Sequence, residues 1–155
     1  MKRLIVLCAV SICFFLMIMS CEKDGDCKEV ITVPHMYLED FGGTDDCGLD
    51  FTSAVADSNY LIEDEYYYQE LMDCQDSIMD FTKYVLLTGS RQFDTTVVKK
   101  NQAAIRNCKD HTFTYRISFE VTDTVDTKFH QYHAIVPKIP DDYQVSFEIV
   151  VWRNY

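Results

Sequence analysis

The stretch TFTYRISFEVT, residues 112–122, decides the fold class. Its apolar residues alternate without a break with Thr, Arg, Ser and Glu side chains. Successive side chains of a β-strand point to opposite faces, so this period of two predicts a half-buried strand. The face expected to be buried consists of Phe113, Tyr115, Ile117, Phe119 and Val121.

Two further strands are expected on the C-terminal side. Residues 129–136 (FHQYHAIV) form one, and residues 143–152 (YQVSFEIVVW) form the other, again with alternating apolar side chains. The Asp- and Thr-rich residues 123–127 predict a turn before the first of them. Short connections between successive strands favour antiparallel pairing.

On the N-terminal side, the sequence predicts shorter strands. Residues 30–33 (VITV) form a strand that Pro34 ends, because proline cannot donate to a β-ladder. Residues 80–89 (DFTKYVLLTG) form another, and residues 97–98 and 103–105 are weaker candidates around a turn at 99–101.

One short helix is expected near residues 64–75. The acids Glu63, Asp64 and Glu65 suit a helix N-terminus, and Tyr67, Leu71 and Cys74 then recur at helical spacing. The predicted fold is therefore mainly β (α+β): an antiparallel sheet or sandwich with one short helix packed against it.

The first residues have the pattern of an export signal. Met1-Lys2-Arg3 is positively charged, and the uncharged residues 4–19 would span roughly 24 Å as a helix, short of a bilayer core of roughly 30 Å. That length favours the apolar region of a secretory signal. The segment ends Ile18-Met19-Ser20-Cys21.

This ending resembles the bacterial lipobox, with an aliphatic residue, a small residue and then cysteine. The resemblance implies that Cys21 is acylated and becomes the first mature residue. The organisation expected is a lipoprotein signal peptide (1–20), a lipidated tether (21–29) and a single β-rich domain (30–155). Several acyl chains anchor a protein firmly to a lipid bilayer. An uncleaved anchor with a chance cysteine is the alternative.

The residues after Cys21, EKDGD (22–26), resemble the lysine-and-acid tract of Bacteroidetes-type surface lipoproteins. There the tract accompanies export to the outer face of the outer membrane. The resemblance implies a lipid-anchored protein of the cell envelope, in the outer membrane and displayed at the cell surface. A solvated tether is the other interpretation, and the sequence leaves the orientation open.

The globular part is similar to small uncharacterised β-rich Bacteroidetes lipoproteins. The similarity lies in an acid-rich helix followed by DFTKYVLLTG (80–89) and later by YHAIVPKIPDDYQVSFEI (132–149). The first of these segments is also similar to the C-terminal domain of protease-complex-stabilising PrcB-like proteins. That resemblance implies a β-rich module that binds another protein.

Seven cysteines divide into three groups. Cys8 and Cys13 would leave with the signal peptide, and Cys21 would carry the lipid. The remaining four, an even number in an oxidising compartment, predict disulfides. These are Cys27, Cys47, Cys74 and Cys108. Three pairings are open, and Cys27–Cys47 with Cys74–Cys108 is favoured because short loops close first.

Charge excludes one class of partner. The formal net charge is −11, and removing the leader, whose charges are Lys2 and Arg3, makes it −13. A domain with this negative charge is repelled by phosphate backbones. We therefore expect no nucleic-acid partner.

No metal, cofactor or catalytic constellation is expected. His130 and His133 lie three apart in a predicted strand, where their rings point to opposite faces. The acids Asp45, Asp46 and Asp50 lack the spacing of a calcium loop. Motifs for nucleotide, zinc or nucleophile chemistry do not occur in the sequence. We therefore expect no enzyme; a hydrolase with dispersed acidic residues is the remote alternative.

Three aromatic residues are the candidate partner contacts. A helix cannot bury all of Tyr66-Tyr67-Tyr68, and Trp152 lies on the polar side of the last strand. Tyr66, Tyr68 and Trp152 are therefore expected to contact another envelope or extracellular protein. The function expected is a membrane-anchored, non-enzymatic protein-binding or accessory module, with a structural envelope lipoprotein as the alternative.

Overall fold

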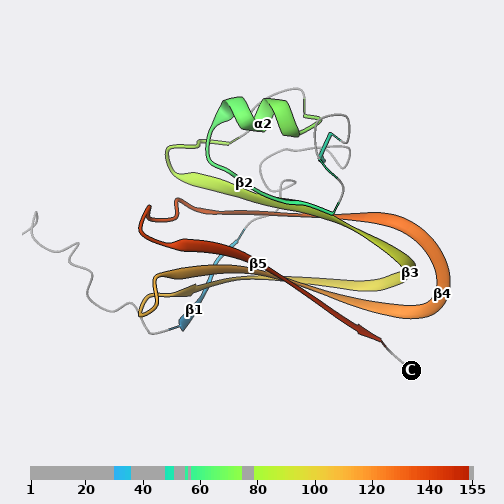
Figure 1. The fold of residues 1–155 in the computed structure, drawn as a ribbon. Helices are drawn as coiled ribbons and strands as arrows, with labels where there is room; N and C mark the ends of the chain where they lie inside the picture. The colour runs from blue at the N-terminus through green and yellow to red at the C-terminus, as the bar shows by residue number, and fades with distance from the viewer. Residues whose placement is uncertain (1–29, 36–47, 51–54, 56, 75–78, 154–155) are drawn as a thin grey trace, which may run out of the picture.

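The computed structural model describes the chain except residues 1–29, 36–47, 51–54, 56, 75–78 and 154–155. The expected signal peptide, the lipidated tether and Cys21 lie outside the described residues. The mainly β fold with one short helix is confirmed (Figure 1). Its elements are β1 (Val30–Val33), β2 (Asn59–Ile62), α2 (Glu65–Leu71), β3 (Tyr84–Asn107), β4 (Thr112–Pro137) and β5 (Gln144–Arg153).

The long hairpin of β3 and β4 organises the fold. The turns expected at 99–101 and 123–127 are wrong, because both segments continue these two strands. Threonine and valine recur in residues 121–127 and, just before residue 99, at Thr95, Thr96, Val97 and Val98, and both residue types favour extended backbone. Three register shifts between Phe93 and Lys99 bend the hairpin there, as β-bulges do. Each strand therefore passes through two layers (Figure 1).

The bend divides the sheet into an upper and a lower layer, named as they lie in Figure 1. The upper layer contains β2 with residues 84–93 and 128–137, and the lower layer contains β1, residues 99–107 and 112–120, and β5. Tyr132 and Val136 from above meet Tyr115 and Phe119 from below in the main core. All five apolar residues expected to be buried in 112–122 are at most 2% exposed, so that prediction is confirmed.

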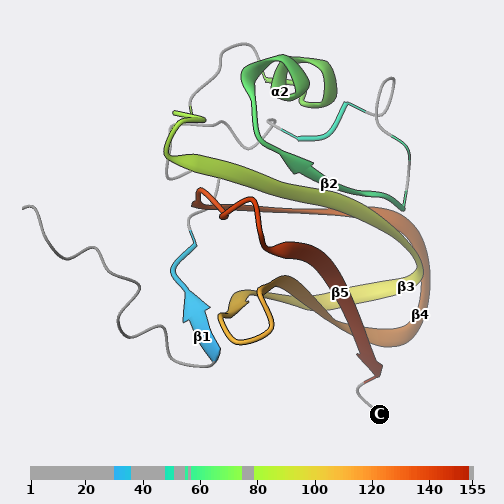
Figure 2. The ribbon, with the colours of Figure 1, turned by 60° about the vertical axis from the view of Figure 1, so that its left-hand side comes forward.

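One pairing differs from the expected antiparallel sheet. β5 runs parallel to β4, with Thr112 opposite Gln144 and Val121 opposite Arg153. The cause is the bend, because β4 returns in the upper layer to the end of the molecule at which it started. The connection to β5 then descends at that end (Figure 2), where the Gln144 amide donates to the His111 carbonyl at 2.8 Å. The sheet is therefore mixed.

Helix α2 lies on the outer face of the upper layer. Asp64 caps it, its Oδ1 accepting from the Tyr67 amide at 2.9 Å. The buried face is one position away from the expected one, since Tyr68 and Met72 are buried while Tyr67 is 54% exposed. In so short a helix, three consecutive tyrosines do not reveal which face is buried. The buried face is set by Leu86 and Ile135, against which the helix packs. No helix in the described part of the chain is long and apolar enough to cross a membrane.

Candidate functional site

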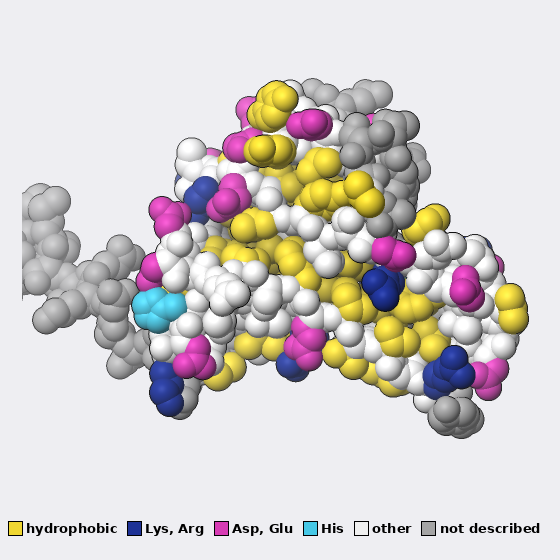
Figure 3. Space-filling model, viewed as in Figure 1, with side chains coloured by type: hydrophobic (Ala, Val, Ile, Leu, Met, Phe, Trp, Pro, Cys, Tyr) yellow, Lys and Arg dark blue, Asp and Glu magenta, His cyan; other side chains and the backbone are white. Residues whose placement is uncertain are grey.

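Exposed apolar side chains gather where the hairpin bends. Two lie near the end of β5, where Val151 pairs with Phe119 and Trp152 pairs with Glu120. The others lie in or next to the bent part of β3 and β4. We call this set the bend surface: Val98, Val125, Phe129, Val151 and Trp152. Figure 3 shows apolar side chains interspersed with charged ones at this right-hand end. Such exposure is typical of interaction sites.

The edge of β5 adjoins the bend surface. Among the described strands, β5 pairs with β4 and with no other. Its outer backbone groups along Gln144–Arg153 are thus not part of the described sheet ladder. An unpaired edge is a template for a strand from another chain. Its apolar residues Val145, Phe147 and Ile149 pack against the main core and hold the strand in place.

The three predicted contact residues do not form one surface. Tyr66 is 72% exposed on α2, and Trp152 is 38% exposed at the end of β5. These two elements lie at different ends of the molecule (Figure 1). The prediction for Tyr68 is wrong, because its ring is fully buried and packs edge-on against Phe81 at 5.7 Å between centroids. Burial also raises the pKa of its hydroxyl.

Two of the four predicted disulfide residues are described. Cys74 and Cys108 are both disulfide-bonded, whereas Cys27 and Cys47 lie outside the described residues. The neighbours of Cys47 and Cys74 are in contact, since the Asp73 amide donates to the Gly48 carbonyl at 2.8 Å. Next to Cys108, Asn107 pairs with Val30, three residues after Cys27.

These contacts favour a different connectivity from the one expected. Cys74 packs against the core beneath α2, above the upper layer, whereas Cys108 follows the last residue of β3 in the lower layer. We therefore expect a non-reducing peptide map to link Cys74 to Cys47 and Cys108 to Cys27. A peptide joining Cys74 to Cys108 would contradict this prediction.

The two central histidines point to opposite faces, as expected. His130 lies near Phe93 and Phe119, with ring centroids 5.9 and 6.4 Å away. His133 lies on the other face, with Nδ1 2.9 Å from the Thr88 hydroxyl. Burial, with a contribution from Lys100, lowers the pKa of His133 to about 4.

Metal ligands do not converge in the described part of the chain, where no group of three His, Cys, Asp or Glu could hold an ion. The acids Asp45 and Asp46, considered for a calcium loop, lie outside the described residues. Asp50 is described, and its amide donates to the Leu71 carbonyl at 2.9 Å.

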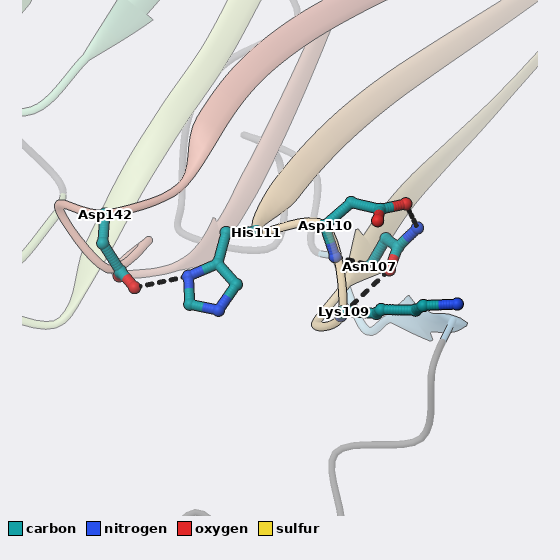
Figure 4. Close-up of polar contacts among 5 residues, drawn as sticks. All are labelled: Asn107, Lys109, Asp110, His111 and Asp142. Carbon is teal, nitrogen blue, oxygen red and sulfur yellow. Dashed lines mark hydrogen bonds and ion pairs between the residues drawn. The ribbon is translucent and has the colours of Figure 1, made fainter.

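At the other end of the lower layer, a set of polar contacts joins the β3–β4 turn to the segment before β5 (Figure 4). We call this set the clasp: Asn107, Lys109, Asp110, His111 and Asp142. The Asn107 side-chain oxygen accepts from the Lys109 and Asp110 amides at 3.1 and 3.2 Å, which shapes the β3–β4 turn. His111 has a positive φ of 50° and places Nδ1 2.6 Å from Asp142 Oδ2. The clasp therefore joins this turn to the segment before β5.

A groove of about 230 Å³ opens at the same end, between β1, this hairpin and the segment after β4. Its lining is mostly apolar but includes Arg106 and Lys138. Sequence reasoning missed Arg106, although its position was readable. Arg106 lies two residues after Ala104, which belongs to the predicted strand 103–105. A period of two therefore places the two side chains on the same face.

Comparison with protein-family models, curated proteins and solved structures found no match for this chain. Its function must therefore be inferred from the surfaces described above. Two of them stand out: the bend surface with the β5 edge, and the groove at the opposite end.

Proposed function

We propose that the chain is a lipid-anchored lipoprotein of the cell envelope that binds a protein partner through the bend surface and the β5 edge. The lipobox supports the anchor at Cys21, and bonded Cys74 and Cys108 suit an oxidising compartment. The observation that carries the proposal is the position of the bend surface relative to β1.

The bend surface lies away from the point where the tether joins the domain. Val30, the first residue of β1, pairs with Asn107 next to the β3–β4 turn. The ladder of β4 with β5 runs from that end to Val121 and Arg153, a length of roughly 30 Å at about 3.3 Å per residue. A domain held at β1 therefore leaves its bend surface open to a partner.

The β5 edge indicates what kind of partner fits. An extended segment can add to it as a further strand, with main-chain hydrogen bonds giving affinity and an apolar side chain meeting Trp152. Two arginines of this part of the sheet are already paired, Arg116 with Glu148 at 2.7 Å and Arg153 with Asp123 at 3.8 Å. In a chain of net charge −11, the complementary segment is basic.

Site-specific photo-crosslinking in intact envelopes tests the proposal. A photoreactive residue in place of Val151 should give one major adduct, and the same residue in place of Tyr67 on α2 should not. Trp152→Ser should lower the adduct yield about tenfold, as expected for an aromatic contact of about 1–2 kcal/mol, whereas Tyr66→Ser should not. Rising salt should also weaken the adduct. Equal adducts from both positions, or no effect of Trp152→Ser, would exclude this surface.

The same preparation tests the anchor. Cys21→Ser should abolish incorporation of labelled palmitate, while the wild-type chain should be labelled and remain with the membrane on carbonate washing. Labelling of the Cys21→Ser chain would show that the lipid is attached elsewhere.

A further inference from the structure

The groove at the tether end contains a cation that the fold does not use. Arg106 pairs in the sheet with Ile31 on one side and Phe113 on the other, so its side chain emerges between two apolar neighbours on the core face. Its Nε is buried and has no hydrogen-bond partner. Within the described part of the chain, no carboxylate forms an ion pair with Arg106. A half-buried charge without a partner is costly and is seldom retained without a use.

A second cation lies on the same groove. Lys138 follows β4, and its amide donates to the Lys83 carbonyl at 2.8 Å, which fixes the segment that forms one wall. Its Nζ is 4.0 Å from Glu63, at the limit of an ion pair, and its side chain is partly exposed. Lys138 can therefore turn toward a stronger anion. Two cations on one groove stand out in a chain whose net charge is −11.

The rest of the lining is apolar. Ile31 and Val33 contribute from β1, Phe113 from β4, and Ile139 from the connection to β5, with prolines at the rim. These residues offer no hydrogen-bonding side chain to a polar ligand body. The groove therefore combines two cationic side chains with an apolar wall.

We propose that this groove binds a small monocarboxylate with an aliphatic chain of about six to eight carbons. The size follows from the volume, since a cavity of about 150 Å³ accommodates a six-carbon ring and the groove has about 230 Å³. The carboxylate pairs end-on with the two terminal nitrogens of Arg106, a planar fork that suits two oxygens. The chain lies against Phe113 and Ile139. This site is separate from the bend surface and independent of the partner proposed there.

Binding of hexanoate to the full-length chain in phosphatidylcholine nanodiscs tests the assignment, with empty nanodiscs subtracted for partitioning. Carboxyl-labelled hexanoate followed by NMR should show saturable binding. Hexan-1-ol and hexylammonium, which keep the chain but lose or reverse the charge, should bind at least about tenfold more weakly, the value of one charge-assisted hydrogen bond. Equal binding of the alcohol would overturn the proposal, as would the lack of saturable hexanoate binding.

Arg106→Gln should weaken hexanoate binding about ten- to hundredfold, and Lys138→Gln by a smaller factor. Arg116→Gln is the matched control, because Arg116 is an exposed arginine on the same hairpin that already pairs with Glu148. It should leave binding unchanged. Thermal unfolding of each variant checks that it folds. If Arg106→Gln does not fold, the comparison of the three ligands on the wild-type chain still tests whether the groove selects a carboxylate. Unchanged binding in a folded Arg106→Gln chain would show that Arg106 only shields the core.

Discussion

Replacing Gly89 by alanine is expected to destabilise the domain by about 3 kcal/mol, at the upper end of the range for overpacked cores. Gly89 lies in β3 opposite Tyr132, and the Asn59 residue of β2 pairs with it from the other side. A Cβ there would lie 2.6 Å from Tyr132 Cε2 and 2.7 Å from the Ser58 backbone oxygen. Neither atom can move freely. Tyr132 is buried in the main core, and the Ser58 carbonyl accepts from the Ser90 amide at 3.1 Å.

Denaturant unfolding of the full chain, with its disulfides intact, would measure this effect as a lower transition midpoint. Gly48→Ala is the matched control. A Cβ at Gly48 would also collide, but with the side-chain end of Gln131, which can rotate at the cost of its hydrogen bond to the Leu49 amide. We expect a loss of about 1 kcal/mol there. Equal losses at both glycines would mean that the strand spacing around Gly89 relaxes easily.

Acidification is expected to remove about 3 kcal/mol of stability through His133. The folded-state pKa of this histidine is lowered to about 4 from 6.5, by burial first and then by Lys100. Between these two values the unfolded chain binds a proton that the folded chain does not. Stability therefore falls as the pH drops through this window, and the full contribution is lost near pH 4. Burial also lowers the pKa of His130, so this histidine changes stability in the same direction.

Unfolding free energies measured from about pH 7 down to about pH 4 would show this slope. His133→Gln should flatten it, because glutamine does not titrate and can still bond to the Thr88 hydroxyl, which lies 2.9 Å from the ring nitrogen. A slope that survives in His133→Gln would assign the effect to other groups.

Local sequence patterns predicted the features that depend on a single strand, namely where it lies in the sequence and which of its faces is buried. Residues 112–122 became the buried row of β4, because a period of two records which face is buried. Residues 30–33, a β-branched run that ends at Pro34, became β1. The turns failed for the opposite reason. The polar segment 123–127 lies in the bend, where β4 continues while its side chains face water. Composition alone cannot distinguish a turn from a bent, exposed strand.

The parallel pairing of β5 and the groove depend on contacts that are distant in sequence. Once β4 crosses from one layer to the other, the direction of the next strand is set by where β4 ends, which no local pattern records. Arg106 became a candidate only when Ile31 and Phe113 were brought to its two sides. Tyr68 was misplaced by one helical position because its burial depends on Leu86 and Ile135 from other strands.

The pairing of β1 also determines how the domain would respond to a pulling force. A partner held at the bend and an anchor beyond Val30 would stretch the lower layer along its strands. The ladder bonds between β1 and β3 run across the strands. In a chain whose disulfides are reduced, so that no bridge from Cys27 to Cys108 carries the load, tension along the strands would strain the four pairs from Val30–Asn107 to Val33–Ala104 together. Such a shearing geometry resists rupture better than peeling the pairs apart one after another. If the chain is anchored and binds a partner as proposed, the short strand β1 would keep its pairing with β3 under tension even when the bridge is reduced.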